Sequence, residues 1–133
     1  MKRKLLKNTL SSFGFLLAVS LGVSVTACQK RASTEPQAYL GEPKVGDVYV
    51  VRFKPVGDTV SRYYFYKLYR VTPDSALFHP ARKESEKADA DVKGADFFAD
   101  TQTLAYTRKE LPDLLKEQPG DVLKTRLVGI RRE

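Results

Sequence analysis

One histidine and a few hydroxyl groups are the residues of this chain best suited to acid–base or nucleophilic chemistry. An imidazole such as that of His79 can act as a general base when a nucleophile lies within hydrogen-bond reach. The hydroxyl nearest to it along the chain belongs to Ser75, in a segment whose proline and aspartate predict a turn. His79 itself precedes Pro80 at the end of a short apolar run. This position is typical of a strand end, and we expect no catalytic dyad here.

A cluster of acids follows, from Asp89 to Asp100. With Asp91 and Gly94 at the third and sixth positions, this segment resembles the EF-hand calcium loop. Lys93, however, occupies the third ligand position, where its ammonium group would repel a dication. Asp100 also replaces the usual bidentate glutamate, and no convincing helices flank the segment. We therefore expect an acidic surface loop that holds no metal.

The only cysteine, Cys28, ends the sequence Val25-Thr26-Ala27-Cys28. A basic start, an apolar run from Phe13 to Val25 and small residues before a cut are the anatomy of a secretory signal. The last four residues resemble the lipobox of bacterial lipoproteins. This resemblance covers residues 1–28 only. It implies that the signal peptide 1–27 is removed, that the Cys28 thiol receives a diacylglycerol, and that the new amino terminus is often acylated as well, for instance with palmitate.

Two other interpretations of this segment stay open. Residues 8–29 carry no charge and are long enough to span a bilayer as an uncleaved helix, although serine, glycine and threonine dilute their apolar character. The chain could also be an ordinary secreted protein with a chance cysteine. The order of basic flank, apolar core and motif favours the lipoprotein. We expect a lipid anchor in the cell membrane or, since Gln29 rather than aspartate follows Cys28, in the outer membrane, with the domain outside the cytoplasm.

The charge of the chain excludes one class of partner. The formal net charge is +7, but four of the 23 basic residues and none of the 16 acids lie in residues 1–27. The remaining 19 basic and 16 acidic side chains are interspersed, which is not the footprint of a nucleic-acid-binding protein. With the thiol of Cys28 used for lipid, one histidine is too few for a zinc site, which needs three or four ligands. We expect no cofactor, no metal and no nucleic acid.

The pattern after the signal predicts a tether and one small domain. Residues 28–44 contain little apolar material and are expected to be a flexible, lipid-anchored tether. Residues 45–133 are expected to fold as a mainly β domain with one short helix (α+β), built on a small antiparallel sheet that is strongly bent or barrel-like. Thr107 and Glu110 predict a capping box at the helix start. Strands are expected at 47–53, 60–71, 76–79, 104–106 and 122–132, and the helix between 107 and 119. A charged excursion is expected at 81–94, after which Phe97-Phe98 should return to the core.

The second predicted strand, Val60 to Val71, carries five aromatic residues. We expect Phe65 and Tyr69 to face the core, because Val71 continues their side of the strand. The opposite side is a candidate ligand face that could stack on a sugar or a peptide. Burial of the strand on both sides is the alternative. The candidate ligand face consists of Tyr64, Tyr66, Arg62 and Arg70.

For the function, the sequence leaves two classes open. We favour a non-catalytic binding or assembly module at the membrane surface that acts on an envelope protein or glycan. The alternative is a small envelope hydrolase or a metal-dependent enzyme. The scarcity of catalytic side chains and the lack of a Gly-x-Ser-x-Gly motif favour the binding module.

Overall fold

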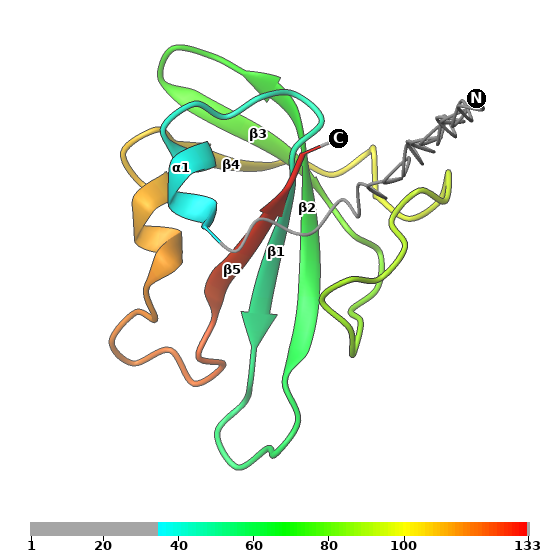
Figure 1. Cartoon of the computed structure of the whole chain (residues 1–133), viewed down its shortest axis with the longest axis vertical. Helices are drawn as coiled ribbons and strands as arrows, with labels where there is room; N and C mark the ends of the chain where they lie inside the picture. Colours follow the sequence, from blue (N-terminus) through cyan, green and yellow to red (C-terminus); the bar gives the residue numbers. More distant parts are fainter. Residues whose placement is uncertain (1–34, 133) are drawn as a thin grey trace, which may run out of the picture.

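The computed structural model describes residues 35–132, which are built around one five-stranded antiparallel sheet in the order β4-β3-β2-β1-β5 (Figure 1). The mainly β fold with one short helix is confirmed. The sheet is bent but does not close into a barrel. Residues 1–34, and with them the predicted signal peptide, Cys28 and the first part of the predicted tether, lie outside the described residues. The elements are α1 Pro36–Leu40, β1 Val48–Phe53, β2 Arg62–Val71, β3 Ser75–Pro80, β4 Leu104–Thr107, the 3-10 helix η1 Leu111–Leu115 and β5 Arg126–Arg131.

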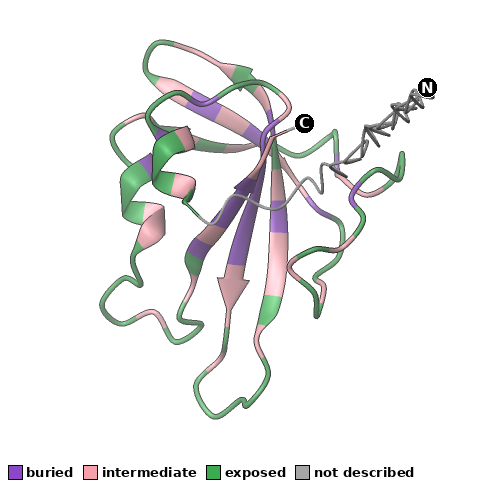
Figure 2. Ribbon diagram, in the orientation of Figure 1, coloured by how far each residue is buried: buried purple, intermediate pink, exposed green. Residues whose placement is uncertain are grey.

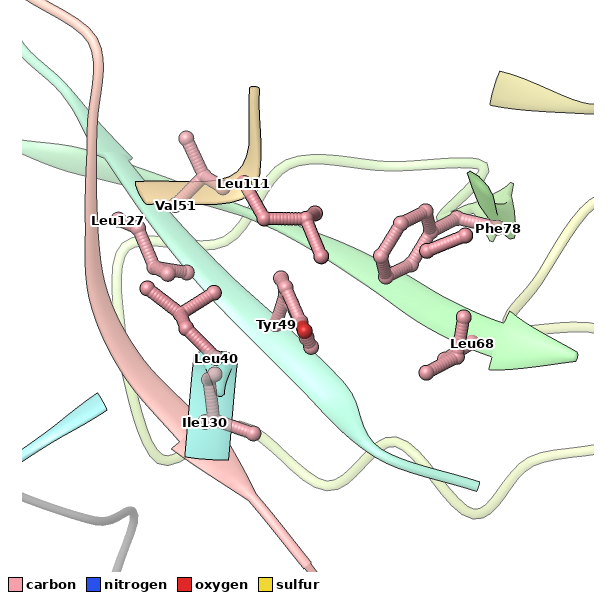
Figure 3. Close-up of a cluster of buried hydrophobic side chains, with 9 residues drawn as sticks. Leu40, Tyr49, Val51, Leu68, Phe78, Leu111, Leu127 and Ile130 are labelled. Atoms are coloured by element: carbon pink, nitrogen blue, oxygen red, sulfur yellow. The ribbon is translucent and has the colours of Figure 1, made fainter. Parts of the chain in front are cut away.

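Both faces of the sheet are covered (Figures 1 and 2). On the helix-covered face, α1 and η1 contribute Leu40 and Leu111 to a buried cluster. Figure 3 shows most of this cluster around Tyr49. On the loop-covered face, the segment 81–103 packs over a smaller cluster that includes Phe65. The strand β1, which lies between β2 and β5, is thus apolar on both sides, which explains its almost uninterrupted apolar sequence.

Phe97 and Phe98 return the long loop to the core, as the sequence predicted. The ring of Phe97 meets the ring of Phe65 edge-on at a centroid distance of 5.6 Å. The ring centroids of Phe97 and Phe98 are 5.0 Å apart, and both side chains pack against the buried cluster of the loop-covered face. Such edge-to-face contacts add to the apolar burial of the rings. They hold a segment that has little regular structure of its own.

The prediction of a flexible tether up to residue 44 is wrong from residue 36 onward. Residues 36–40 form α1, and Leu40 is buried in the cluster of the helix-covered face. The guanidinium carbon of Arg132 lies 4.2 Å from the ring centroid of Tyr39. Tyr39 and Leu40, two apolar side chains in a polar stretch, pack against the cluster, because the sheet offers them a site that the local sequence does not reveal.

The predicted helix after residue 107 is only a 3-10 helix, and its capping box is confirmed. The backbone N–H of Thr107 donates to Oε2 of Glu110 at 2.8 Å, and the backbone N–H of Glu110 donates to Oγ1 of Thr107 at 3.2 Å. Pro112 stands within η1 and cannot donate a helical hydrogen bond, which suits a short element.

The last strand begins at Arg126, four residues later than predicted. The carboxylate of Asp121 accepts hydrogen bonds from the backbone N–H groups of Leu123 and Thr125, at 2.9 and 2.8 Å. Lys124 adopts a positive φ of 49° within this turn. These local bonds curl residues 121–125 into a turn that competes with an extended backbone.

The assignment of the two sides of β2 also needs a correction. The register with β3 shifts between Leu68 and Arg70, which places a β-bulge at Tyr69. Beyond the bulge Val71 packs in the cluster of the helix-covered face, whereas Phe65 belongs to the loop-covered face. Phe65 and Val71 therefore do not share a side, because the extra residue reverses the alternation along the strand.

Candidate functional site

The four residues of the predicted ligand face do not form one surface. Tyr64 and Tyr66 lie together, with ring centroids 5.6 Å apart, but the hydroxyl of Tyr64 donates to the backbone carbonyl of Ala81 at 2.8 Å. Arg62 is exposed and forms an ion pair with Glu84. Arg70 pairs with Leu77 beyond the bulge, so it points to the face opposite Val71 and Tyr66. Of the four, Tyr66 lines a mostly apolar hollow.

That hollow lies on the helix-covered face and is here named the aromatic cup. It has a volume of about 310 Å³, which is within the range of small-molecule sites. Its wall is mostly apolar and comes from β1, β2, β4, η1 and β5, with Tyr49 and Phe78 behind it. The wall includes Val51, Tyr66, Tyr106, Leu114 and Leu127. The rim is polar and includes Glu110, Asp113, Lys116, Gln118, Asp121 and Arg126.

The aromatic rings at the base of the cup contact one another edge-on. Tyr49 is paired with Tyr66 across β1 and β2 and meets Phe78 edge-on at 4.7 Å. Phe78 in turn meets Tyr106 edge-on at 6.0 Å. Tyr49 and Phe78 are 1% and 0% exposed, so they form the fixed base of the cup. Figure 3 shows both side chains within the core. Tyr66 and Tyr106, which are half-buried, present the accessible ring surface.

Two accessible tyrosine hydroxyls of the cup, those of Tyr66 and Tyr106, are free for a ligand. Burial raises the pKa of Tyr66 to about 12, and burial together with the charge of Glu110 raises the pKa of Tyr106. Both phenols therefore stay protonated at neutral pH. Within residues 35–132, neither hydroxyl takes part in a hydrogen bond. Each can donate one hydrogen bond and accept another.

Two acids of the rim, Glu110 and Asp121, are held in the charged form. Hydrogen bonds from Thr107 lower the pKa of Glu110, and hydrogen bonds from the backbone of Thr125 and Leu123 lower the pKa of Asp121. A general acid at neutral pH needs the opposite shift. Gln118 is also engaged, since its side-chain amide donates to the carbonyl of Asp113 at 3.2 Å. The rim can therefore orient a bound molecule with fixed polar groups of both signs.

The residues considered for catalysis and metal binding lie elsewhere. His79 and Ser75 stand near opposite ends of β3, and the His79 ring stacks on Tyr69 at 3.8 Å while its Nδ1 bonds the carbonyl of Gln102 at 2.8 Å. In the acidic loop, Asp91 accepts a hydrogen bond from the backbone of Lys93. Among the described residues, no group of three or more potential ligands is placed to hold a metal ion.

Sequence reasoning identified one residue of the cup and missed the others. Tyr66 was selected for its aromatic strand, whereas Tyr106 and Leu114 lie 40 and 48 residues further along the chain. The nearest local signal is the reciprocal pair of hydrogen bonds between Thr107 and Glu110, which closes the turn between β4 and η1. The convergence itself depends on the pairing of β3 with both β2 and β4.

Comparison of the chain with protein-family models, with curated proteins and with solved structures found no match. Across residues 35–132, none of the helical segments has the length and apolar character needed to cross a membrane.

Proposed function

We propose that this chain is a lipid-anchored protein of the bacterial envelope whose domain is a non-catalytic binding module. Its ligand site is the aromatic cup. The observation that carries the proposal is the combination, in one hollow of about 310 Å³, of accessible tyrosine rings with two hydroxyls that have no protein partner in the described chain. Membrane attachment is supported by the lipobox-like sequence that ends at Cys28.

The chemistry of the cup favours a sugar ring of a glycan as the ligand. The apolar face of a pyranose can stack on Tyr66 and Tyr106, and its hydroxyls can pair with the two phenols and with the charged rim. An apolar side chain of a partner protein would fill the same space but would leave both phenols without a bond. Leaving a buried polar group unpaired costs about 1 to 3 kcal/mol.

The rim supports binding rather than hydrolysis. Glycoside hydrolysis needs a carboxylic acid that is protonated near neutral pH, beside a second carboxylate. Glu110 and Asp121 have lowered pKa values because each accepts hydrogen bonds from its own turn of backbone. These carboxylates can hold sugar hydroxyls, and they are unsuited to protonating a leaving group.

The test is a binding titration with the full chain in a polyoxyethylene detergent, which carries no sugar. Short soluble oligosaccharides, chitotriose and maltotriose among them, are the probes, and calorimetry or NMR is the readout. Tyr66→Phe and Tyr106→Phe each remove one hydroxyl and keep the ring. We expect each to weaken binding about 3- to 10-fold, the worth of one hydrogen bond.

Tyr63→Phe is the matched control, because Tyr63 lies against the cluster of the other face. It should leave the affinity unchanged. Failure of every oligosaccharide to bind would overturn the glycan ligand. An equal loss in the control would show that the cup is not the site.

A further inference from the structure

A second hollow lies on the loop-covered face, beside the start of β1. It has a volume of about 450 Å³ and is bounded by β1, β2, β3, β5 and the segment 92–100. We name it the basic hollow, because its charged lining consists of Lys67, Lys93 and Arg131 with one acid, Asp100, while His79 also lines it. It shares no lining residue with the aromatic cup.

The sheet places the basic residues in a row. Lys67 is paired with His79 on one side and with Val48 on the other, and Val48 is paired with Arg131. Residues directly opposite on neighbouring strands project from the same face. The row therefore crosses four adjacent strands, β3-β2-β1-β5, with buried Val48 between the two cations. Lys93 joins the row from the loop above it.

The three cations of the hollow have no ion-pair partner in the described part of the chain. The structure shows five ion pairs among residues 35–132, and none of them includes Lys67, Lys93 or Arg131. Asp100 forms an ion pair with Arg82, in which Oδ1 of Asp100 lies 3.7 Å from Nη2 of Arg82. Three like charges around one hollow repel one another, and an anion between them would relieve that repulsion.

Two of the cations are already positioned. Arg131 donates from Nη1 to the carbonyl of Ala90 at 2.7 Å, which fixes the guanidinium and leaves its other N–H groups for a second acceptor. The ammonium of Lys67 lies 5.7 Å from the ring centroid of Phe98. A guanidinium fork beside lysine ammonium groups matches the oxygens of a phosphate group.

We propose that the basic hollow is a binding site for a phosphate group, carried either by a soluble molecule or by the headgroup of an anionic lipid. The juxtaposition of Lys67, Lys93 and Arg131 around one hollow, without an ion pair to any of them among residues 35–132, carries the assignment. The site is independent of the aromatic cup and of any ligand bound there. A lipid source suits a domain attached to the membrane surface.

The experiment uses the full chain in a non-ionic detergent and titrates it with inorganic pyrophosphate at low ionic strength. NMR chemical shifts and calorimetry are the readouts. Lys67→Gln combined with Lys93→Gln should weaken binding about 10- to 30-fold, since each basic residue beside a phosphate contributes about one order of magnitude or less. Arg131 is kept, because its bond to Ala90 supports the fold.

The matched control is Lys54→Gln combined with Lys109→Gln. It changes the net charge equally, and both lysines are exposed and lie outside the hollow. It should leave the affinity within about twofold of the original value. An equal loss in both double variants would overturn the site in favour of general charge attraction. Absence of binding at millimolar pyrophosphate, together with absence of the lipid effect described next, would also overturn it.

A second arm identifies the source of the phosphate. The detergent micelles are doped with phosphatidylglycerol in place of added pyrophosphate. Shifts at Lys67, Lys93 and Arg131 that the first double variant abolishes would support a lipid headgroup. Shifts with pyrophosphate alone would support a soluble ligand. Either result supports the site.

Discussion

At the scale of single residues, one buried charge ties the two ends of the domain together. Asp47 is 1% exposed, and its carboxylate accepts two hydrogen bonds from Arg132, both at 2.8 Å, and one from the backbone of Lys44. Arg132 also donates to the carbonyl of Glu42 and lies over the ring of Tyr39. One side chain after β5 therefore holds α1 and the turn before β1 in place.

Removing this carboxylate should destabilise the fold. We expect Asp47→Ala to lower the free energy of unfolding by about 3 kcal/mol. The substitution removes the buried carboxylate that accepts hydrogen bonds from Arg132 and from the backbone N–H of Lys44. Urea unfolding followed by circular dichroism measures the change. Asp58→Ala removes an exposed acid and should stay within about 0.5 kcal/mol of the unchanged protein. A comparable effect of the two substitutions would contradict the role of Asp47.

The raised pKa of Tyr66 makes the stability depend on alkaline pH. Burial raises this pKa from 10.0 to about 12, so the folded protein holds the phenol proton more tightly than the unfolded chain does. The resulting stabilisation is fully present below pH 10 and is lost as the pH rises through 12. Urea unfolding at a series of pH values should show this decline, and Tyr66→Phe should make it shallower. An identical slope in both proteins would refute the assignment.

At the scale of elements, β2 is the strand on which both faces of the molecule depend. It is the partner of β1 and of β3, and its bulge at Tyr69 turns Val71 toward the helix-covered face. Phe65 and Leu68, both 0% exposed, belong to opposite clusters. The same strand supplies Tyr66 to the aromatic cup and Lys67 to the basic hollow. Alternation along one strand thus separates the two proposed sites.

Truncations along β2 should reflect this burial. We expect Phe65→Ala to lower the free energy of unfolding by about 3 to 5 kcal/mol, as for other fully buried aromatic residues. Tyr66→Ala should cost less, since the Tyr66 side chain is only partly buried at the cup. Melting temperatures of the two variants test whether Phe65→Ala causes the larger loss of stability. Arg70→Ala, at an exposed position, is the reference. A larger loss for Tyr66→Ala would mean that the cup is not open to solvent.

At the scale of the whole molecule, the two proposed sites occupy opposite faces of one sheet, and membrane attachment is predicted to come from Cys28, outside the described residues. We expect the native protein to fractionate with membranes and to carry lipid on Cys28. Cys28→Ser should abolish lipid attachment and leave an uncleaved or mislocalised precursor. Mass spectrometry of the native protein is the measurement, and an unmodified thiol at Cys28 would refute the anchor.

The sequence alone predicted most of the local structure of the domain. Strands were placed within a few residues at 47–53, 60–71, 76–79 and 104–106, and the Thr107–Glu110 capping box and the return of Phe97-Phe98 to the core were correctly predicted. These features depend on neighbours in the chain: on β-branched and aromatic runs, on turn residues and on side chains that bond the nearby backbone. The mixed charge that argued against a nucleic-acid partner is likewise a property of composition.

Only the tertiary structure decided which side chains meet. The bulge at Tyr69 arises from the pairing of β2 with β3, and it reverses the faces that simple alternation predicts. The docking of α1 depends on a site offered by the sheet, in which Leu40 is buried. The cup joins Tyr66 to Tyr106, and the basic hollow joins Lys67 to Arg131, across strand pairings that the intervening sequence does not encode locally. Register between strands is a long-range property, and for that reason both proposed sites became visible only when the chain was folded.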